Sequence, residues 1–284
     1  MERLPLGEYR EFRRWSGKPK HWGPPGSGWQ AWFGGQVIDG LCDTLDRHLA
    51  GQLGQPRRDA TPAAIGCVPW LTSDSVIDRL LKLSACCIVI DKGRRVAPKR
   101  LVMHDRPFPN VLPGLRDTAP SVDGSAPVIG PYSGMPEHEL GPVRVVGWRQ
   151  VGIDTSKPLL HAKMLVLGHL GIEKFGPDDS LYTEELVFTP SSVWWGSANW
   201  TRGAEFHIEF GCWSDDPDFT EHATEFVSDV VRFSEPIEST TVGPEPDLVT
   251  VVIDDEAMAE AAMEQADAPE SEEWDRLIEG EDES

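Results

Sequence analysis

The sequence has no long hydrophobic run. Among its 284 residues, no stretch reaches the roughly 18 consecutive apolar residues of a membrane span. The first residues, MERLPLGEYREFRRW, are charged and lack the apolar core of a secretory signal peptide. Cysteine is scarce, and an odd count of five without a CxxC pair argues against a disulfide framework and a thiolate zinc site. These absences predict a cytoplasmic protein.

Two neighbouring cysteines indicate how the thiols are used. Cys86 and Cys87 lie in the apolar run ACCIVID, which has the character of a buried strand. Successive side chains of a strand point to opposite faces of its sheet, so each thiol would enter a different layer of the interior. We therefore expect both to be small core residues.

Positive charge is also in short supply. The chain has 26 Lys and Arg against 47 Asp and Glu, which gives a formal net charge of −21. Much of this excess is local, because from Glu245 onward there are 16 acidic residues and one basic residue, Arg276. The tail thus carries −15 and the remainder −6. The overall charge therefore does not exclude a polyanionic partner for the body of the chain.

Composition predicts three regions. Residues 1–60 contain a segment rich in Trp, Gly and Pro, followed by apolar positions at helical spacing in residues 36–50, and this region should pack on the core. Residues 61–235 form the main domain. Residues 236–284 form an acidic, partly disordered tail. The tail is either a solubilising extension or a segment that covers a basic surface or recruits a basic partner.

The main domain opens with a strand–helix–strand pattern. The run AAIGCVPW predicts a buried strand that ends at Trp70, and Thr72 or Ser73 can cap a helix that continues to about Leu83. A second apolar strand follows over Ala85 to Asp91. Buried strands joined by a helix indicate a βαβ unit in an α/β sheet.

Further strands and one covering helix are expected downstream. The helix is predicted over Phe219 to Phe233, where apolar residues recur at helical spacing. The strand candidates are VRVVGW, PLLHAKMLVLG, LYTEELVF, SVWWGSANWT and AEFHIEFGCW.

Polar side chains are spaced two residues apart in three of these strand candidates, so each set would share one strand face. PLLHAKMLVLG, from Pro158 to Gly168, is otherwise almost wholly apolar. The alternating polar residues are His161 and Lys163, then Ser197 and Asn199, and finally Glu205, His207 and Glu209.

This combination suits attack on a phosphodiester. A neutral imidazole at His161 can act as the nucleophile and form a phosphohistidine. Lys163 would neutralise the nonbridging oxygens, and Ser197 and Asn199 would donate hydrogen bonds to them. Glu209 could accept the other ring N–H of the nucleophile and fix its tautomer. The scheme requires no metal and no cofactor.

The order of these motifs resembles the phospholipase D superfamily, whose signature is H-x-K-x4-D followed by G-S-x-N. HAK and GSAN carry the resemblance, which extends over roughly Ala63 to Phe233. It implies a mixed β-sheet flanked by helices, an αβα sandwich. By matching position, the resemblance implies a catalytic set of His161 as the nucleophile, Lys163 on phosphate, Ser197 and Asn199 in the pocket, and Glu209 as the acidic residue after GSxN.

The sequence departs from the family pattern at three points. Gly168 stands where the family has Asp, and His207 stands where an Asn is often found. Only one H-x-K motif is present, whereas the family site uses two. The resemblance therefore implies a homodimer, in which the second copy's His161 protonates the leaving group.

A basic cluster follows the strand that ends at Asp91, and it is either a solvated hairpin or a contact for a polyanionic backbone. Its members are Lys92, Arg94, Arg95, Lys99 and Arg100. We expect a nuclease, with DNA favoured over RNA and a role in restriction or phage defence. Two alternatives stay open: a phospholipid-directed phosphodiesterase, and a catalytically weak binding subunit of a larger complex joined through the acidic tail.

Overall fold

A computed structural model of the chain describes residues 20–22, 28–54, 59–93, 98–109, 111–112, 139–149, 159–178, 181–240 and 242–243. The chain divides into two units, Met1–Val249 and Thr250–Ser284, and every described residue lies in the first. Of the predicted acidic tail, residues 236–240 and 242–243 are described and the rest lies outside the described residues, and the three predicted domain limits stay predictions.

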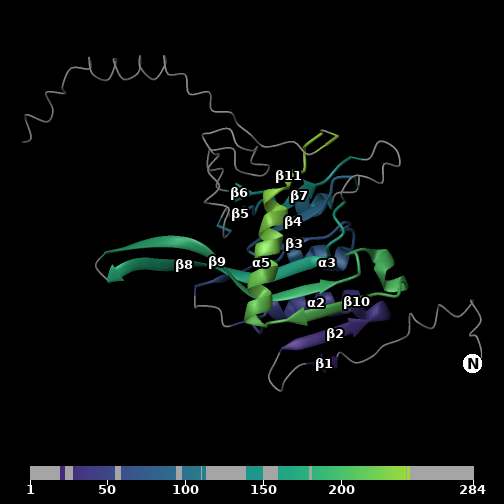
Figure 1. Cartoon of the computed structure of the whole chain (residues 1–284), viewed down its shortest axis with the longest axis horizontal. Helices are drawn as coiled ribbons and strands as arrows, with labels where there is room; N and C mark the ends of the chain where they lie inside the picture. The colour runs from purple at the N-terminus through teal and green to yellow at the C-terminus, as the bar shows by residue number, and fades with distance from the viewer. Residues whose placement is uncertain are drawn as a thin grey trace, which may run out of the picture. The chain divides into compact units, whose positions relative to one another are not determined.

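The described part of the chain forms a nine-stranded sheet in the order β1-β2-β10-β9-β8-β3-β4-β7-β11 (Figure 1). The pairs β3–β4 and β4–β7 are parallel, and the others are antiparallel, so the predicted mixed sheet is confirmed. The strands are β1 Lys20–Trp22, β2 Trp29–Phe33, β3 Thr61–Cys67, β4 Ala85–Asp91, β7 Val143–Val146, β8 Met164–Asp178, β9 Leu181–Gly196, β10 Phe210–Ser214 and β11 Glu235–Pro236. A separate two-stranded sheet pairs β5 (Phe108–Pro109) with β6 (Glu139–Leu140).

Helices cover both faces of the main sheet. The α-helices are α2 Val37–Leu49, α3 Asp74–Leu80, α4 Lys99–Val102 and α5 Pro217–Arg232, and the 3-10 helices are η1 Gly34–Gln36 and η2 Arg202–Phe206. Helices α2 and α3 pack on one face through one apolar cluster, and α5 packs on the other face through a second. The prediction of a sheet flanked by helices is thereby confirmed.

Strand β4 shows how one stretch of sequence serves both layers. All seven of its residues are buried. The side chain of Cys86 belongs to the cluster beneath α2 and α3, whereas that of Cys87 belongs to the cluster beneath α5. Burial raises the pKa of the Cys87 thiol to about 12, so this thiol stays protonated in the interior. Both cysteines are core residues, as expected.

Strands β8 and β9 form a hairpin that is much longer than the strands beside it (Figure 1). Strand β3 pairs with β8 only from Met164 to Leu170. The rest of the hairpin therefore extends beyond the first residue of β3 as a two-stranded ribbon. We call this ribbon, residues 171–178 and 181–187, the arm. The sequence indicated two separate strands across 181–201, whereas β9 is one continuous strand to Gly196.

Three other boundaries differ from expectation. The strand predicted over residues 158–168 begins only at Met164, and SANWT follows β9 rather than forming part of it. The strand predicted for AEFHIEFGCW begins only at Phe210, after η2, so Glu205, His207 and Glu209 do not share a strand face. In addition, β2 is a strand within the N-terminal segment rich in Trp, Gly and Pro, where no strand was predicted. It is held by pairing with β10 and by packing of Trp32 on Trp194, whose rings lie 4.9 Å apart. Within the described residues, no helix is long and apolar enough to cross a membrane.

Candidate functional site

Register brings the candidate residues to one edge of the sheet. Met164 at the start of β8 pairs with Trp195 near the end of β9, and Gly196 pairs with Gly211 in β10. Segments just before β8, just after β9 and just before β10 therefore meet at this edge. The parallel strand β3 also ends here, because Cys67 pairs with Met164. Functional residues commonly gather beyond the carboxyl ends of the strands in α/β sheets.

Lys163 is buried at this edge, with 5% of the residue exposed. Its Nζ donates a hydrogen bond to the carbonyl of His161 at 2.7 Å, and its own carbonyl accepts from the amide of Gly196 at 3.2 Å. Burial lowers the pKa of the Lys163 ammonium, and the nearby carboxylate of Glu209 opposes that change. The lysine thus places a partly desolvated positive charge beside the edge, where it would attract an anion strongly.

Ser197 and Glu209 are joined directly. The Ser197 hydroxyl donates a hydrogen bond to the Glu209 carboxylate and accepts one from the amide of Phe210 at 3.0 Å. The other carboxylate oxygen lies 3.9 Å from Nδ1 of His207. In the described part of one chain, Glu209 has no hydrogen bond or ion pair with His161. The predicted role of Glu209 in orienting that ring stays a prediction.

Asn199 presents an unpaired acceptor. Its Oδ1 atom is buried and has no hydrogen-bond partner among the described residues. The backbone around it is fixed, because the amide of Trp200 donates to the Trp70 carbonyl at 3.1 Å and the amide of Thr72 donates to the Trp200 carbonyl at 2.9 Å. A buried acceptor without a donor is costly, but this atom is not accessible to a bound molecule, so the predicted donation of a hydrogen bond from Asn199 to phosphate stays a prediction.

His161 is exposed, in contrast to Lys163. The segment leading to it is held by Asp91, a buried carboxylate that accepts hydrogen bonds from the amides of Leu160 at 3.2 Å and Gly93 at 2.9 Å. Sequence reasoning did not identify Asp91 as part of this region. The available signal was a single acidic residue at the end of the otherwise apolar run ACCIVID.

No protein-family model and no curated protein matches the sequence. Among solved structures, the chain is similar to NucT from Helicobacter pylori, with a TM-score of 0.42 and 10% identity over 73% of this chain and 98% of that one. It is also similar to Nuc from Salmonella typhimurium, described as a phospholipase D family member, with a TM-score of 0.39 and 13% identity over 73% and 97% of the two chains. At these values of TM-score and identity, the likeness does not establish the role of any residue in this chain.

The packing around Gly168 leaves no space for a side chain at this position. A Cβ atom at this position would lie 2.5 Å from the carbonyl oxygen of Thr189 and 2.6 Å from the ring of Phe188. The pairing of β8 with β9 also shifts by one residue between Leu167 and Gly168. Because backbone and ring atoms occupy the space, this hairpin has no room for the Asp that the phospholipase D pattern expects.

The predicted basic surface is only partly present. Lys92 is buried, and its Nζ donates to the Glu235 carboxylate and to the Gly243 carbonyl, so the prediction that it contacts substrate is wrong. Its charge instead holds the segment after α5 against the end of β4. Lys99 and Arg100 are exposed on α4, and Arg100 pairs with Asp78 at 2.7 Å. Arg94 and Arg95 lie outside the described residues.

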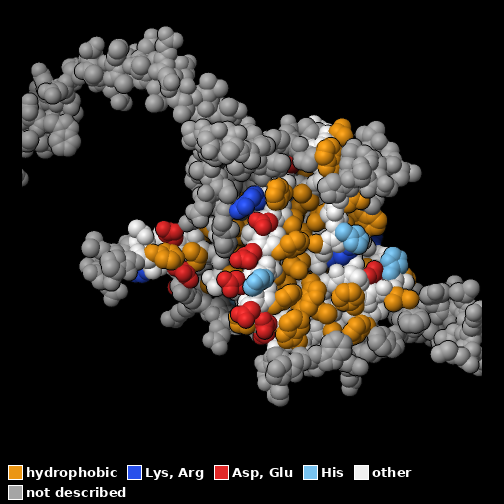
Figure 2. Space-filling model, viewed as in Figure 1, with side chains coloured by type: hydrophobic (Ala, Val, Ile, Leu, Met, Phe, Trp, Pro, Cys, Tyr) orange, Lys and Arg blue, Asp and Glu red, His pale blue; other side chains and the backbone are white. Residues whose placement is uncertain are grey.

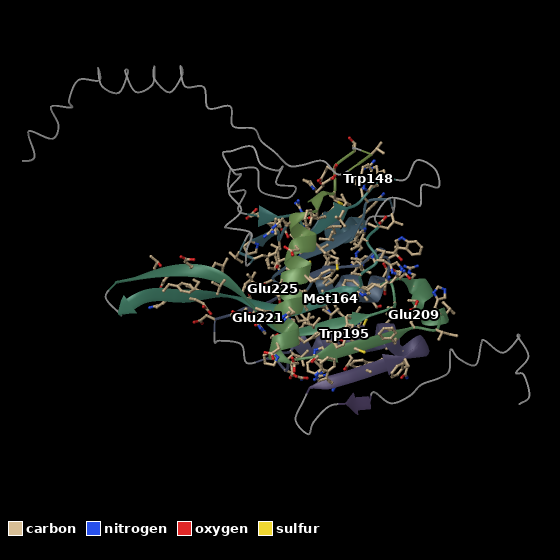
Figure 3. The ribbon with its side chains drawn as sticks, in the orientation of Figure 1. Trp148, Met164, Trp195, Glu209, Glu221 and Glu225 are labelled. Carbon is tan, nitrogen blue, oxygen red and sulfur yellow. The ribbon has the colours of Figure 1, made fainter. Side chains whose placement is uncertain are left out.

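An apolar surface adjoins the site on the α5 face of the sheet. It consists of partly buried side chains beside α5, and Figure 2 shows hydrophobic groups gathered there. Trp195 packs against Phe219 at 4.6 Å between ring centroids, and Met164 pairs with Trp195 across the strands. Figure 3 places Met164 and Trp195 between α5 and Glu209. The apolar surface therefore begins one residue from Lys163.

Proposed function

We propose that this protein is a metal-independent phosphodiesterase that cleaves nucleic acid through a histidine nucleophile. The observation that carries the proposal is that His161, with an exposed imidazole, and Lys163, with a buried ammonium bonded to the His161 carbonyl, lie on the same sheet edge. Asn199 and the linked Ser197–Glu209 pair stand on the neighbouring segments. An exposed nucleophile beside a desolvated cation is the arrangement that attack on a phosphate anion requires.

The proposed reaction has two displacements. A ring nitrogen of His161 attacks phosphorus, the bond from phosphorus to the leaving oxygen breaks, and a second imidazolium gives that oxygen a proton. The same second imidazole then takes a proton from water, whose oxygen attacks phosphorus and releases His161. Lys163 would stabilise the charge on the nonbridging oxygens in both steps. The two steps together consume one water molecule and restore both rings.

The second imidazole has two possible sources. One is His161 of a second copy, which the single H-x-K motif favours. The other is His207 of the same chain, which is exposed and lies 3.9 Å from Glu209. The partly exposed apolar side chains of Met164 and Trp195 support the first source, because exposed apolar patches commonly mark protein interfaces. We therefore propose a two-fold dimer that buries this surface and brings two His161 rings together.

A cleavage assay in EDTA tests the activity. Single- and double-stranded DNA, RNA and phosphatidylcholine vesicles are the substrates, and His161→Ala is compared with His222→Ala, an exposed histidine on α5. The proposal expects nucleic-acid cleavage that survives EDTA, is lost in His161→Ala and persists in His222→Ala. Cleavage retained by His161→Ala contradicts the nucleophile. Turnover of phosphatidylcholine alone would favour the lipid-directed alternative, to which the apolar surface is also suited.

Subunit mixing tests the shared site. Wild-type protein is exchanged with increasing amounts of inactive His161→Ala protein, and the activity is measured against the wild-type fraction. A site that needs two His161 rings loses activity as the square of that fraction, so an equal mixture retains about one quarter. A site that uses His207 of the same chain retains about one half. A linear dependence together with loss of activity in His207→Ala would overturn the dimeric site.

A further inference from the structure

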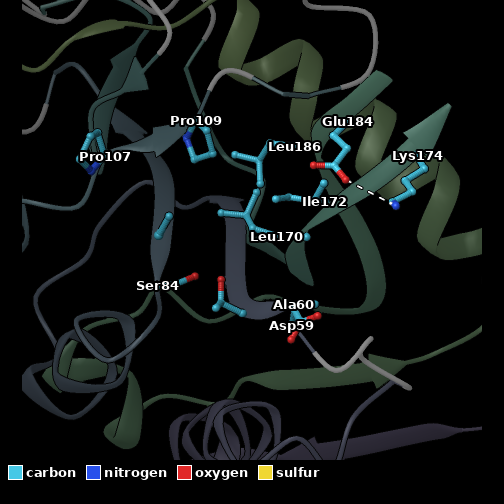
Figure 4. A pocket seen from close by; sticks show the side chains of 13 residues that line it. Asp59, Ala60, Ser84, Pro107, Pro109, Leu170, Ile172, Lys174, Glu184 and Leu186 are labelled. Atoms are coloured by element: carbon cyan, nitrogen blue, oxygen red, sulfur yellow. Dashed lines mark ion pairs between the residues drawn. The ribbon is translucent and has the colours of Figure 1, made fainter. Parts of the chain in front are cut away.

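The arm leaves a hollow where it departs from the body of the sheet. This cleft has a volume of about 640 Å³. One wall is formed by the arm and by Leu170 of β8 beside it. The other is formed by the starts of β3 and β4 and by Pro107 and Pro109, which lie just before and within β5 (Figure 4). Its apolar lining comes from Leu170, Ile172, Leu186, Pro107 and Pro109.

The apolar residues of the arm are exposed to an unusual degree. Ile172 and Leu186 are directly paired across the two strands, and they are 60% and 40% exposed. Cross-strand apolar pairs usually stabilise a sheet by packing against a further layer. This pair has no such layer among the described residues, so its outer surface is open to a partner.

A second hollow follows on the same face of β9. It has a volume of about 410 Å³ and lies between Pro190 and the first half of α5. Leu186 and Pro190 are four residues apart, so the two hollows are separated by about 13 Å along the strand. Thr220 lines the second hollow, is 4% exposed and has an Oγ1 atom without a hydrogen-bond partner in the described part of the chain.

Negative charge surrounds both hollows. Five carboxylates line them against a single ammonium, Lys174, which already lies 3.6 Å from Glu184. Figure 3 shows Glu221 and Glu225 on the flank of α5 that faces the arm. The carboxylates belong to Asp59, Glu184, Asp215, Glu221 and Glu225. A phosphate backbone would be repelled here, whereas Lys and Arg side chains would be attracted.

We propose that this surface, the cleft walled by the arm together with the second hollow beside α5, binds an extended, basic and amphipathic segment of a partner protein. Aliphatic side chains of that segment would cover Ile172 and Leu186, and its Lys or Arg side chains would meet the surrounding carboxylates. The segment would add its backbone beside the arm, as in recognition by strand addition. Charge complementarity selects this occupant over nucleic acid and over a second acidic arm.

The surface is separate from the candidate active site. The cleft residues of β8, Leu170 to Lys174, are six to ten residues from Met164, or about 20–33 Å along the strand. A partner could therefore bind while the other end of β8 holds a substrate. This inference does not rest on the proposed function, and it stands or fails by a binding measurement alone.

Isothermal titration of the full chain with a synthetic peptide tests the proposal. The probe is an N-acetylated peptide of about ten residues in which Lys alternates with Val, long enough to span both hollows. A peptide that alternates Glu with Val is the charge control. Wild-type protein should bind the Lys peptide and not the Glu peptide. Absence of binding to the Lys peptide would overturn the proposal.

Two variants locate the binding. Glu221→Gln/Glu225→Gln removes two carboxylates, and Ile172→Ser/Leu186→Ser removes the apolar pair, each with an expected loss of about tenfold in affinity. Asp39→Asn/Asp43→Asn removes two exposed carboxylates from α2 on the opposite face and should leave the affinity unchanged. Equal losses in the α2 variant would mean attraction by net charge alone. A changed sedimentation coefficient in the Ile172/Leu186 variant would instead assign the surface to a second copy.

Discussion

Ser197 donates its hydroxyl proton to Glu209 while it accepts the amide proton of Phe210. One hydroxyl therefore ties the loop after β9 to the start of β10, across the edge where the candidate site lies. The link leaves His161 exposed on one side and the Oδ1 atom of Asn199 without a partner on the other. The edge thus combines a rigid frame with an exposed imidazole that can meet a ligand.

Ser197→Ala should lower stability by about 1–2 kcal/mol, because it removes a hydrogen bond to a charged group and an acceptor for the Phe210 amide. Glu209→Gln should cost less, since the amide oxygen can still accept from Ser197. Chemical denaturation of both variants and of the double variant measures the coupling between the two side chains. Purely additive losses would show that the hydrogen bond contributes nothing to stability.

Lys163→Met separates stability from function. Burial lowers the pKa of the ammonium, so the folded state holds the charged form less well than the unfolded state does. Methionine fills a similar volume without charge, and we expect an unchanged or higher Tm together with a loss of about 10²–10³-fold in phosphodiesterase activity. Lys163→Arg keeps the charge and serves as the control. A large drop in Tm for Lys163→Met would identify Lys163 as a structural residue.

Gly168→Asp restores the residue that the phospholipase D pattern expects, yet it should damage the protein. The new Cβ would meet the Thr189 carbonyl and the Phe188 ring, neither of which can move without disturbing the hairpin. We expect a destabilisation of about 2–4 kcal/mol, with Gly168→Ala nearly as severe. Gly203→Ala, where the nearest atom is 3.9 Å away, is the control. A variant that keeps the wild-type Tm and gains activity would contradict this account of the hairpin.

The parts of the fold that follow from sequence are those set by local apolar patterns. Strand β4 runs from Ala85 to Asp91 as predicted, and the helices predicted around α2 and α5 are present with ends shifted by one or two residues. Buried parallel strands and amphipathic helices carry strong periodic signals. The opening strand–helix–strand unit is likewise present, because its apolar runs are uninterrupted, although β3 ends at Cys67 rather than Trp70 and α3 ends at Leu80 rather than Leu83.

The structure changes the geometry that the sequence predicted for the candidate site, whereas the roles of its residues stay predictions. His161 and Lys163 were expected on one face of a strand, but both precede β8, and one is exposed while the other is buried. Where a strand begins depends on its neighbours, and β8 begins where β3 and β9 pair with it. The burial of Lys92 could not be predicted from the local sequence either, because its partner Glu235 lies 143 residues away along the chain.

The pair formed by Lys92 and Glu235 should be sensitive to the loss of either charge. Both side chains are almost fully buried, with exposures of 1% and 4%. Lys92→Met leaves a buried carboxylate without its cation, for which we expect a loss of about 3–5 kcal/mol. The double variant Lys92→Met/Glu235→Leu should recover much of this loss, since neither charge remains. Equal stability of the single and double variants, measured by denaturation, would contradict the pairing as the cause.

His48 should make the fold sensitive to mild acid. Its ring is 1% exposed, both ring nitrogens lack a hydrogen-bond partner in the described residues, and the ring lies 4.8 Å from that of His169. Burial, with a smaller effect of His169, lowers the pKa of His48 from 6.5 to about 4, and burial also lowers that of His169. The unfolded chain therefore binds protons that the folded chain excludes.

This difference fixes the direction and the range of the pH effect. Stability should be fully present above pH 6.5 and decline as the pH falls towards 4, by roughly 3 kcal/mol for His48 alone. Denaturation of His48→Leu should give a flatter profile over this range, because the variant has no proton to exclude at that position. If His48→Leu keeps the wild-type slope, other groups cause the acid sensitivity and the buried histidine pair does not.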